Sequence, residues 1–201
     1  MKITSLLKAI LLLHLFCLSG IVNAGDDWDF NSTQEILVPG SVSSELPSIL
    51  TMLPTFLVEK NGEETKSGIP GVIPDLKKTS AVQEHFYLTQ AADGGTLLGV
   101  RINSFDAVKM RLGMLIEHIP STVTIAFFSS GSDTAVLPPL TGGQIQKQIN
   151  SNRANGDLSD NGRTYWGPVV ESGDVVVLLH IPVDINPQAV HIAIPWVRYF
   201  R

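Results

Sequence analysis

The stretch that decides the fold is YWGPVVESGDVVVLLHIP, which occupies residues 165–182. It holds two runs rich in β-branched and aromatic residues, 165–170 and 175–181, separated by the short segment 171–174. Residues of these types favour strands. A connection of this length, with Gly173 suited to a positive φ, favours a hairpin. The stretch therefore predicts two neighbouring antiparallel strands.

Further apolar runs lie on either side of this stretch. In one of them apolar residues alternate with Lys109 and Arg111, which is the period-two pattern of a half-buried strand. Turn-forming Gly, Pro, Asn and Ser residues separate the runs. Short strands with turns between them predict an all-β protein, an antiparallel β-sandwich (jelly-roll-like) with an irregular N-terminal extension. The runs are residues 96–102, 108–116, 122–128 and 190–197.

Two segments lack a clear period. Residues 137–163 are polar, and a turn of helix is predicted only in their middle, at 143–153. Residues 25–80 hold many prolines, which prevent long helices and central strands. They are interpreted as an extended or partly ordered segment with a short amphipathic piece around 44–57. The predicted parts are therefore a signal peptide at 1–24, this segment at 25–80 and a β-sandwich domain at 81–201.

The N-terminus has the parts of a secretory signal peptide. Lys2 and Lys8 precede the apolar run 9–18, and small residues lead to Ala24. The run is shorter than the about 20 residues that span a bilayer, so cleavage after Ala24 is predicted rather than a retained anchor. Cys17 follows a bulky residue, which disfavours a lipoprotein signal, and leaves with the signal peptide. The prediction is a secreted or periplasmic protein of bacterial type with no stable membrane anchor.

The charge and the cysteine content exclude several classes of function. The formal net charge of −5 becomes −7 once Lys2 and Lys8 are removed. An acidic protein is unsuited to nucleic acids and anionic membranes, which are bound through basic patches. Without Cys17 the exported chain has no cysteine, so it forms no disulfide and offers no thiol nucleophile. Its stability must come from its core.

The sequence carries no recognisable catalytic motif. Its histidines outside the signal peptide do not stand in a metal-ligand spacing such as HExxH. Neither the GxSxG pattern of serine hydrolases nor a phosphate-binding glycine motif occurs. We therefore expect no enzymatic activity and no cofactor. The histidines are His85, His118, His180 and His191.

One loop is a weak candidate for a calcium site. Asp157, Asp160 and Asn161 place three oxygen-bearing side chains within five residues, and calcium prefers oxygen ligands. The spacing differs from that of an EF-hand loop, where a distal glutamate completes the coordination shell. A solvated turn explains these residues better.

Two aromatic pairs are candidates for a binding surface, since exposed tryptophan and tyrosine rings stack on sugars. They are Tyr165 with Trp166 and Trp196 with Tyr199. Side chains on a strand alternate between its two faces, so one member of each pair is expected in the core. Core packing therefore competes with binding as the role of these residues.

The C-terminal half resembles a known family. The segments that carry the resemblance are 98–112, His118-Ile119-Pro120 before 123–128, and the long stretch 165–182 with its Trp-x-Pro-Val-Val, Gly-Asp and apolar-Pro features. They resemble the β-sandwich that precedes the catalytic domain in secreted bacterial trypsin-like serine proteases, including lysyl-endopeptidase-like enzymes. The resemblance covers about half of the chain. Because the sequence stops at Arg201, where that catalytic domain would begin, the resemblance places no catalytic triad here.

This resemblance implies an exported, non-catalytic binding or accessory module. Its expected partner is a protein or glycan outside the cytoplasm, with a secreted protease among the candidates. Two alternatives stay open at this point. One is a carbohydrate-binding module, and the other is a remnant or pro-segment of a serine protease without its catalytic domain.

Overall fold

The computed structural model describes residues 52–78, 84–129 and 131–201. All of them belong to one compact unit. The predicted signal peptide, with its cysteine, lies outside the described residues.

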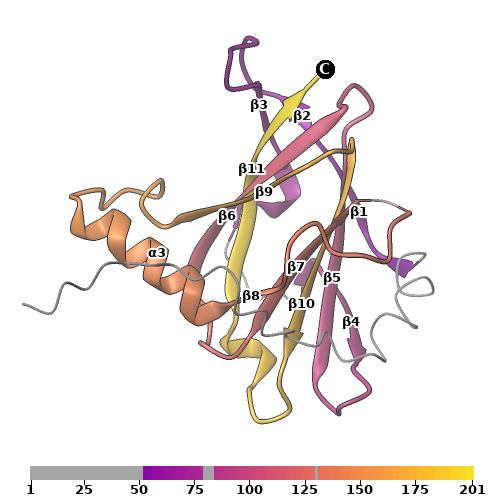
Figure 1. Ribbon diagram of the computed structural model, residues 1–201, viewed down its shortest axis with the longest axis vertical. Helices are drawn as coiled ribbons and strands as arrows, with labels where there is room; N and C mark the ends of the chain where they lie inside the picture. Colours follow the sequence, from indigo (N-terminus) through magenta and orange to yellow (C-terminus); the bar gives the residue numbers. More distant parts are fainter. Residues whose placement is uncertain (1–51, 79–83, 130) are drawn as a thin grey trace, which may run out of the picture. The chain divides into compact units, whose positions relative to one another are not determined.

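The described residues form a sandwich of two sheets, as Figure 1 shows. Neighbouring strands are antiparallel except for β1 and β5, which run parallel. The predicted all-β sandwich is therefore confirmed. The first sheet has the order β1 (Thr55–Leu57), β5 (Thr96–Asn103), β10 (Asp174–Ile181), β7 (Thr124–Ser129) and β8 (Leu140–Thr141), with β4 (Tyr87–Gln90) also paired to β5. The second has the order β2 (Glu59–Lys60), β3 (Ile69–Val72), β11 (His191–Phe200), β6 (Lys109–His118) and β9 (Thr164–Val170).

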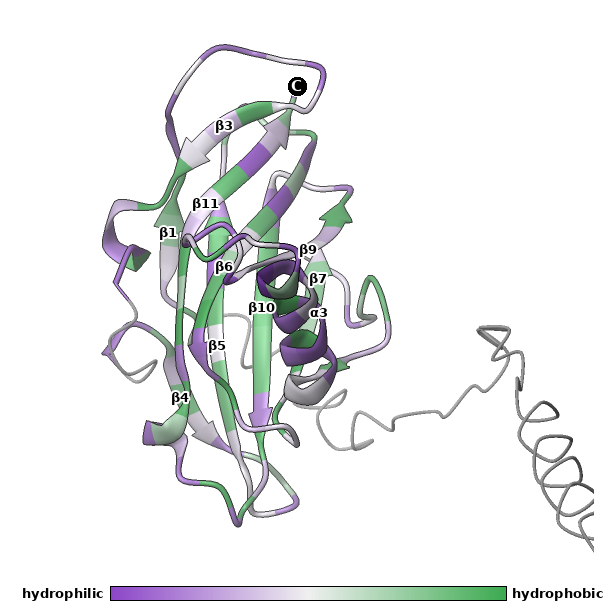
Figure 2. Cartoon of the chain, turned by 90° about the vertical axis from the view of Figure 1, so that its left-hand side faces the viewer, coloured by the Kyte–Doolittle hydropathy of each residue, from purple (hydrophilic) through white to green (hydrophobic). Residues whose placement is uncertain are grey.

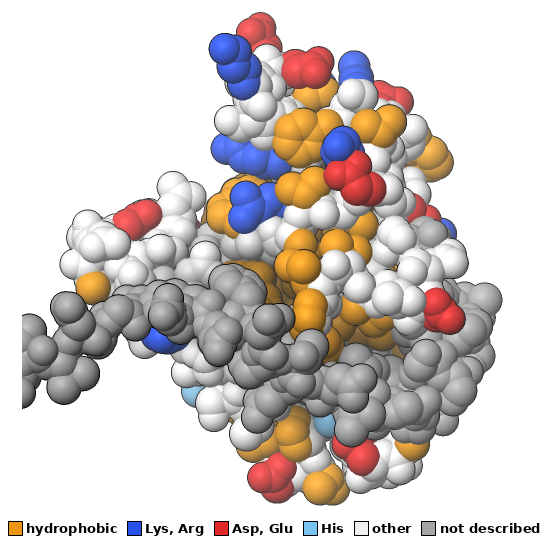
Figure 3. Space-filling view, in the orientation of Figure 1, with side chains coloured by type: hydrophobic (Ala, Val, Ile, Leu, Met, Phe, Trp, Pro, Cys, Tyr) orange, Lys and Arg blue, Asp and Glu red, His pale blue; other side chains and the backbone are white. Residues whose placement is uncertain are grey.

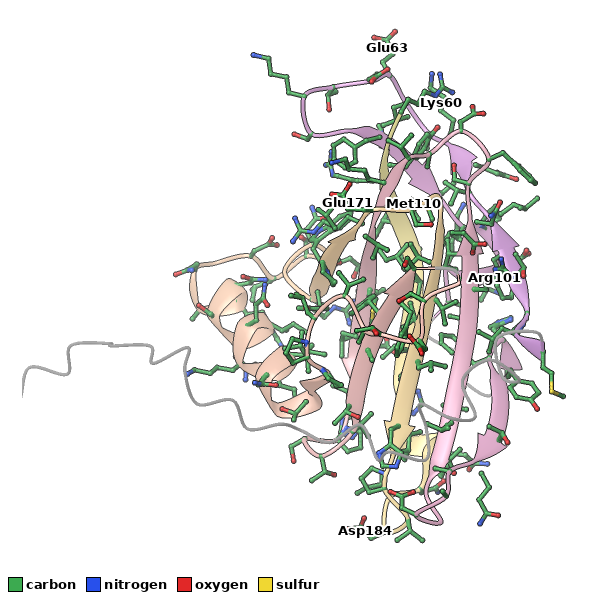
Figure 4. The ribbon with its side chains drawn as sticks, turned by 45° about the vertical axis from the view of Figure 1, so that its right-hand side comes forward. Lys60, Glu63, Arg101, Met110, Glu171 and Asp184 are labelled. Carbon is green, nitrogen blue, oxygen red and sulfur yellow. The ribbon has the colours of Figure 1, made fainter. Side chains whose placement is uncertain are left out.

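The main core lies between the two sheets. Alternate residues of β10 and β6 point inward, and Val177, Leu179, Leu112 and Met114 are each at most 1% exposed. Complete burial of such a side chain contributes about 1.5–3 kcal/mol. Figure 4 shows Met110, another of these residues, among the strands of the sandwich. The period-two pattern in the sequence thus sets which face of each strand enters the core.

The predicted hairpin between the two runs of residues 165–182 is wrong. β9 pairs with β6 in the second sheet, whereas β10 pairs with β5 and β7 in the first. The connection crosses the sandwich because Val170 and Val175, at its two ends, are both fully buried in the core. Gly173 does not have the expected positive φ. It serves close packing instead, since a Cβ there would lie 2.3 Å from the carbonyl oxygen of Ala107.

Three strands precede residue 81, where the sequence placed the start of the sandwich. β1 lies in the first sheet with Thr55 opposite Arg101, and β3 lies in the second sheet with Ile69 opposite Tyr199. Pro54 and Pro70 are accommodated because their carbonyls still accept hydrogen bonds, from Arg101 N–H at 3.0 Å and from Asn61 N–H at 2.8 Å. The sandwich therefore includes the described part of the segment 25–80.

An α-helix, α3 (Gly142–Ala154), occupies about half of the polar stretch 137–163, for which the sequence predicted a single turn. A capping box starts it: Thr141 Oγ1 accepts from the N–H of Gln144, and the Gln144 side chain accepts from the N–H of Thr141. Ile145 and Ile149 are its buried apolar side chains, and Figure 2 shows the rest as mainly hydrophilic. Among the described residues, no helix is long and apolar enough to cross a membrane.

Candidate binding surface

Two tryptophans lie on the outer face of the second sheet, on either side of one glycine. Gly113 of β6 lies opposite Trp166 of β9 on one side and opposite Trp196 of β11 on the other. Directly opposed residues of antiparallel strands point to the same face, so the two indoles flank a glycine across three strands. A Cβ on Gly113 would lie 3.0 Å from Cη2 of Trp166, so this ring rests on the glycine backbone. Both tryptophans are half-buried.

Two arginines stand next to this pair. Arg111 and Arg198 lie opposite each other on β6 and β11, and their guanidinium carbons are 5.9 Å and 5.7 Å from the centre of the Trp166 ring. Cation–π contacts of this kind are worth about 0.5–1 kcal/mol at exposed sites. Arg111 is also fixed to the backbone, since its Nε donates to the carbonyl of Gly167 at 2.7 Å. The ring of Trp166 is thereby held in one place by charge and by packing.

We call this surface the tryptophan–arginine face, meaning Trp166, Trp196, Arg111 and Arg198 with their neighbours Pro70, Val72 and Val169. Carboxylates stand only at its margins among the described residues. Glu171 pairs there with Lys109 at 2.9 Å, and Glu59 lies opposite Val72 on the edge strand β2. The face is thus an aromatic and apolar surface with positive charge at its centre, on a protein whose net charge is negative.

The structure separates the four aromatic residues that the sequence singled out. Tyr165 and Tyr199 are 7% and 3% exposed and lie in the core between the sheets, whereas Trp166 and Trp196 share the outer face. Burial raises the pKa of the Tyr165 phenol, although the charge of Arg111 opposes that shift. A surface ligand can therefore reach the two tryptophans but not the two tyrosines.

The weak calcium candidate lies on the exposed loop that follows α3. Asp157 accepts hydrogen bonds from the hydroxyl and the N–H of Ser159, which hold the pKa of its carboxyl below the usual value. Asp160 pairs with Arg163 at 2.5 Å. Asn161 donates its N–H to Ser159. Protein donors thus engage both carboxylates, and within the described ranges no group of three or more His, Cys, Asp or Glu residues is arranged to hold a metal ion.

Three of the four histidines lie on strands, and the fourth, His85, lies in the turn before β4. His180, on β10, lies 2.8 Å from a carboxylate oxygen of Asp93 in the turn between β4 and β5. The pKa of Asp93 is lowered, first by the N–H of Gly95 and next by the hydrogen bond with His180. His118 and His191 lie opposite each other at the ends of β6 and β11. These contacts connect strands and a turn, and none of them places a histidine against a serine or another nucleophile.

A small hollow lies between α3 and the end of β6. Its volume is about 220 Å³, below the roughly 300–1,000 Å³ of typical small-molecule sites. Glu117 and Arg163 both line it and approach each other to 3.9 Å. The tryptophan–arginine face is therefore the better candidate for binding a macromolecule, while this hollow is small for a ligand.

Sequence reasoning identified the two tryptophans but missed the arginines and the glycine between them. Alternation alone could have grouped Arg111 with Gly113, because they share a face of the 108–116 run. Whether Arg111 and Gly113 lie beside Trp196 depends on how β6 pairs with β11, and the register of that pairing is interrupted by bulges. No local signal reports that register.

The described residues thus form an all-β sandwich that carries two tryptophans and two arginines on the outer face of one sheet. Residues 52–201 match the family model described as the lysyl endopeptidase N-terminal domain, and the chain belongs to this family. The match begins at Met52, three residues before β1, and so includes every strand of both sheets. No protease domain lies within the 201 residues. A comparison with curated proteins finds no match.

Proposed function

We propose that this chain is an exported binding module that contacts the catalytic domain of a trypsin-like protease through its tryptophan–arginine face. The observation that carries the proposal is the placement of Trp166 and Trp196 across Gly113, beside Arg111 and Arg198, on one accessible sheet face. Membership of the lysyl endopeptidase N-terminal family supports the choice of partner.

The composition of the face favours a protein partner. Tryptophan and arginine are the residues most enriched among those that dominate the binding energy of protein interfaces. Trp166 is already held by Gly113 and the two guanidinium groups, so little conformational entropy would be lost when a partner covers it. Because neither arginine forms an ion pair with a described carboxylate, the complementary partner surface is apolar with acidic groups.

The test measures binding of the exported protein to a purified lysyl-endopeptidase catalytic domain by biolayer interferometry. We expect Trp166→Ala and Trp196→Ala each to weaken binding ten- to thirty-fold, which corresponds to about 1.4–2 kcal/mol. Arg198→Gln should mainly slow association and reduce its dependence on salt. Phe105→Ala is the matched control, since Phe105 is 86% exposed and lies outside the face.

Two outcomes would contradict the proposal. The first is no binding to the catalytic domain by the unaltered protein. The second is binding that the tryptophan variants and the Phe105→Ala control change equally. Capture of a trypsin-like protease from the culture supernatant, followed by the same variant series, checks the result with a native partner.

A carbohydrate-binding role is the second candidate, because two half-exposed indoles on one face also suit sugar rings. Titration with soluble polysaccharides would then change tryptophan fluorescence, and the change would be lost in Trp196→Ala. Unaltered fluorescence across the panel would remove this candidate.

A further inference from the structure

The hollow between α3 and the end of β6 has two well-defined walls. One wall is a stripe of the helix, because four lining residues stand at the spacing i, i+3, i+4, i+7: Gln146, Ile149, Asn150 and Arg153. The opposite wall comes from residues 116–119 and from Arg163, which precedes β9. Segments that are distant in sequence therefore converge on one small site.

Hydrogen bonds hold the two walls in place. The side-chain amide of Gln146 donates to the carbonyl of Ile119, which ties α3 to the chain that follows β6. The N–H of Ile116 donates to the carbonyl of Arg163 at 3.1 Å, so the backbone of Arg163 is fixed beside β6. The hollow is thus preformed, and a ligand that enters it causes little loss of conformational entropy.

The lining combines an apolar base with a polar rim. The base consists of three isoleucines that are each at most 7% exposed: Ile116, Ile119 and Ile149. The rim includes three exposed side chains whose N–H groups can donate hydrogen bonds: His118, Asn150 and Arg153. Ligand sites in proteins are typically apolar with a few convergent polar groups, and this hollow has that arrangement on a small scale.

The charges around the hollow favour an anion. Glu117 is the only carboxylate among the described residues that line it, and it pairs with Arg163 at 3.9 Å. Arg163 also pairs with Asp160 at 2.5 Å, whereas Arg153 forms no ion pair with a described carboxylate. On the face shown in Figure 3, charged side chains crowd the end of the domain near β2 and β3, while few lie around α3. The guanidinium of Arg153 can therefore pair with an incoming carboxylate, and a cation would be repelled by the two arginines.

We infer that this hollow binds a carboxylate that is attached to a short apolar group. The carboxylate accepts hydrogen bonds from Arg153, Asn150 and His118, and the apolar group packs on the isoleucine base. A volume of about 220 Å³ is small for a drug-sized molecule, but it fits one side chain or one chain end. The C-terminal residue of a peptide offers this chemistry, as does an acidic side chain. The site shares no residue with the tryptophan–arginine face, so binding here does not require the proposed protease contact.

The test titrates the exported protein with N-acetyl-leucine and follows the histidine ring protons by proton NMR. The His118 signals, identified by their loss in His118→Asn, should shift and saturate with a millimolar Kd, as expected for a ligand of this size. N-acetyl-leucinamide lacks the carboxylate and should bind about ten-fold more weakly. N-acetyl-glutamic acid α-amide carries the carboxylate on its side chain. Tighter binding of this third probe than of N-acetyl-leucine assigns the site to acidic side chains, and weaker binding assigns it to peptide C-termini.

Two variants connect the binding to the charge of Arg153. Arg153→Gln should weaken the binding of N-acetyl-leucine about ten-fold, because it removes the charge that pairs with the carboxylate. Lys66→Gln is the matched control, since it removes the same charge from the exposed loop between β2 and β3 and should leave the Kd unchanged. Absence of any His118 shift, equal binding of N-acetyl-leucine and its amide, or equal Kd values for the two variants would each overturn the inference.

Discussion

Replacement of Asp174 by asparagine tests whether the ion pair at the start of β10 stabilises the first sheet. Arg101 on β5 donates from Nε to both carboxylate oxygens of Asp174, at 2.8 Å and 2.9 Å, and its Nη2 also bonds the carboxylate. This contact raises the pKa of Arg101. The side chains are 33% and 17% exposed, so solvent screens the pair only in part.

Hydrogen bonds to charged groups contribute about 1.5–3 kcal/mol, and the exposure of Arg101 favours the lower end, about 1.5–2 kcal/mol. In a domain of this size that loss lowers the thermal midpoint by about 3–8 °C. The assay is thermal unfolding at pH 7 followed by circular dichroism. Asp184→Asn is the control, because Asp184 lies in an exposed loop, as Figure 4 shows, and should move the midpoint by less than about 2 °C.

A double-mutant cycle makes the test specific to the pair. Arg101→Met combined with Asp174→Asn should destabilise the protein by less than the sum of the two single variants, because either change alone already breaks the contact. Strict additivity, or an Asp174→Asn midpoint equal to that of the Asp184→Asn control, would refute the reasoning.

Three further predictions concern other parts of the sandwich. Asp93 has a lowered pKa in the folded state, so the stability that its carboxylate contributes is present above its unfolded pKa of about 3.9 and is lost as the pH falls through its folded pKa. Asp93→Asn should therefore lower the thermal midpoint at pH 7 but not near pH 2. Thr141→Ala removes the helix cap and should cost about 1 kcal/mol in denaturant unfolding, with faster amide exchange confined to the first turn of α3. Gly113→Ala places a methyl group 3.0 Å from the Trp166 ring, so it should shift the tryptophan emission and lower the free energy of unfolding by about 1 kcal/mol. An unchanged emission spectrum would mean that the ring does not rest on Gly113.

The elements of the sandwich could largely be predicted from local patterns. The runs at 96–102, 108–116, 122–128 and 190–197 correspond to strands β5, β6, β7 and β11, because short apolar runs bounded by turn residues are typical of strands. The continuous run 175–181 also forms a strand, β10, although both of its faces are apolar.

The partners of these strands could not be predicted in the same way. The connection 171–174 has the length and composition of a hairpin, but the chain there passes from one sheet to the other. That choice depends on pairing with β5, β6 and β7, which are distant in sequence. The prolines in residues 52–78 argue against strands there, so β1, β2 and β3 could not be predicted. The length of α3 could not be predicted either, because only Ile145 and Ile149 mark its buried side.

The binding surface was accessible to sequence reasoning only in part. Exposed tryptophan rings often take part in binding, so residue type and strand position are enough to select Trp166 and Trp196 as candidate binding residues. Their assembly around Gly113 depends on the register of three strands, β9, β6 and β11, and on the bulges that interrupt it. Local periodicity contains no information about such bulges.

The central place of β11 in the second sheet has a consequence for the order of folding. β11 pairs with β3 on one side and with β6 on the other, so Tyr199 completes a contact with Ile69 that spans most of the domain's sequence. Pairings of such long sequence separation make folding slow, typically milliseconds to seconds. The second sheet cannot close until β11 has been synthesised, so the two-sheet core between β3, β6 and β11 is completed only after the whole domain has been made.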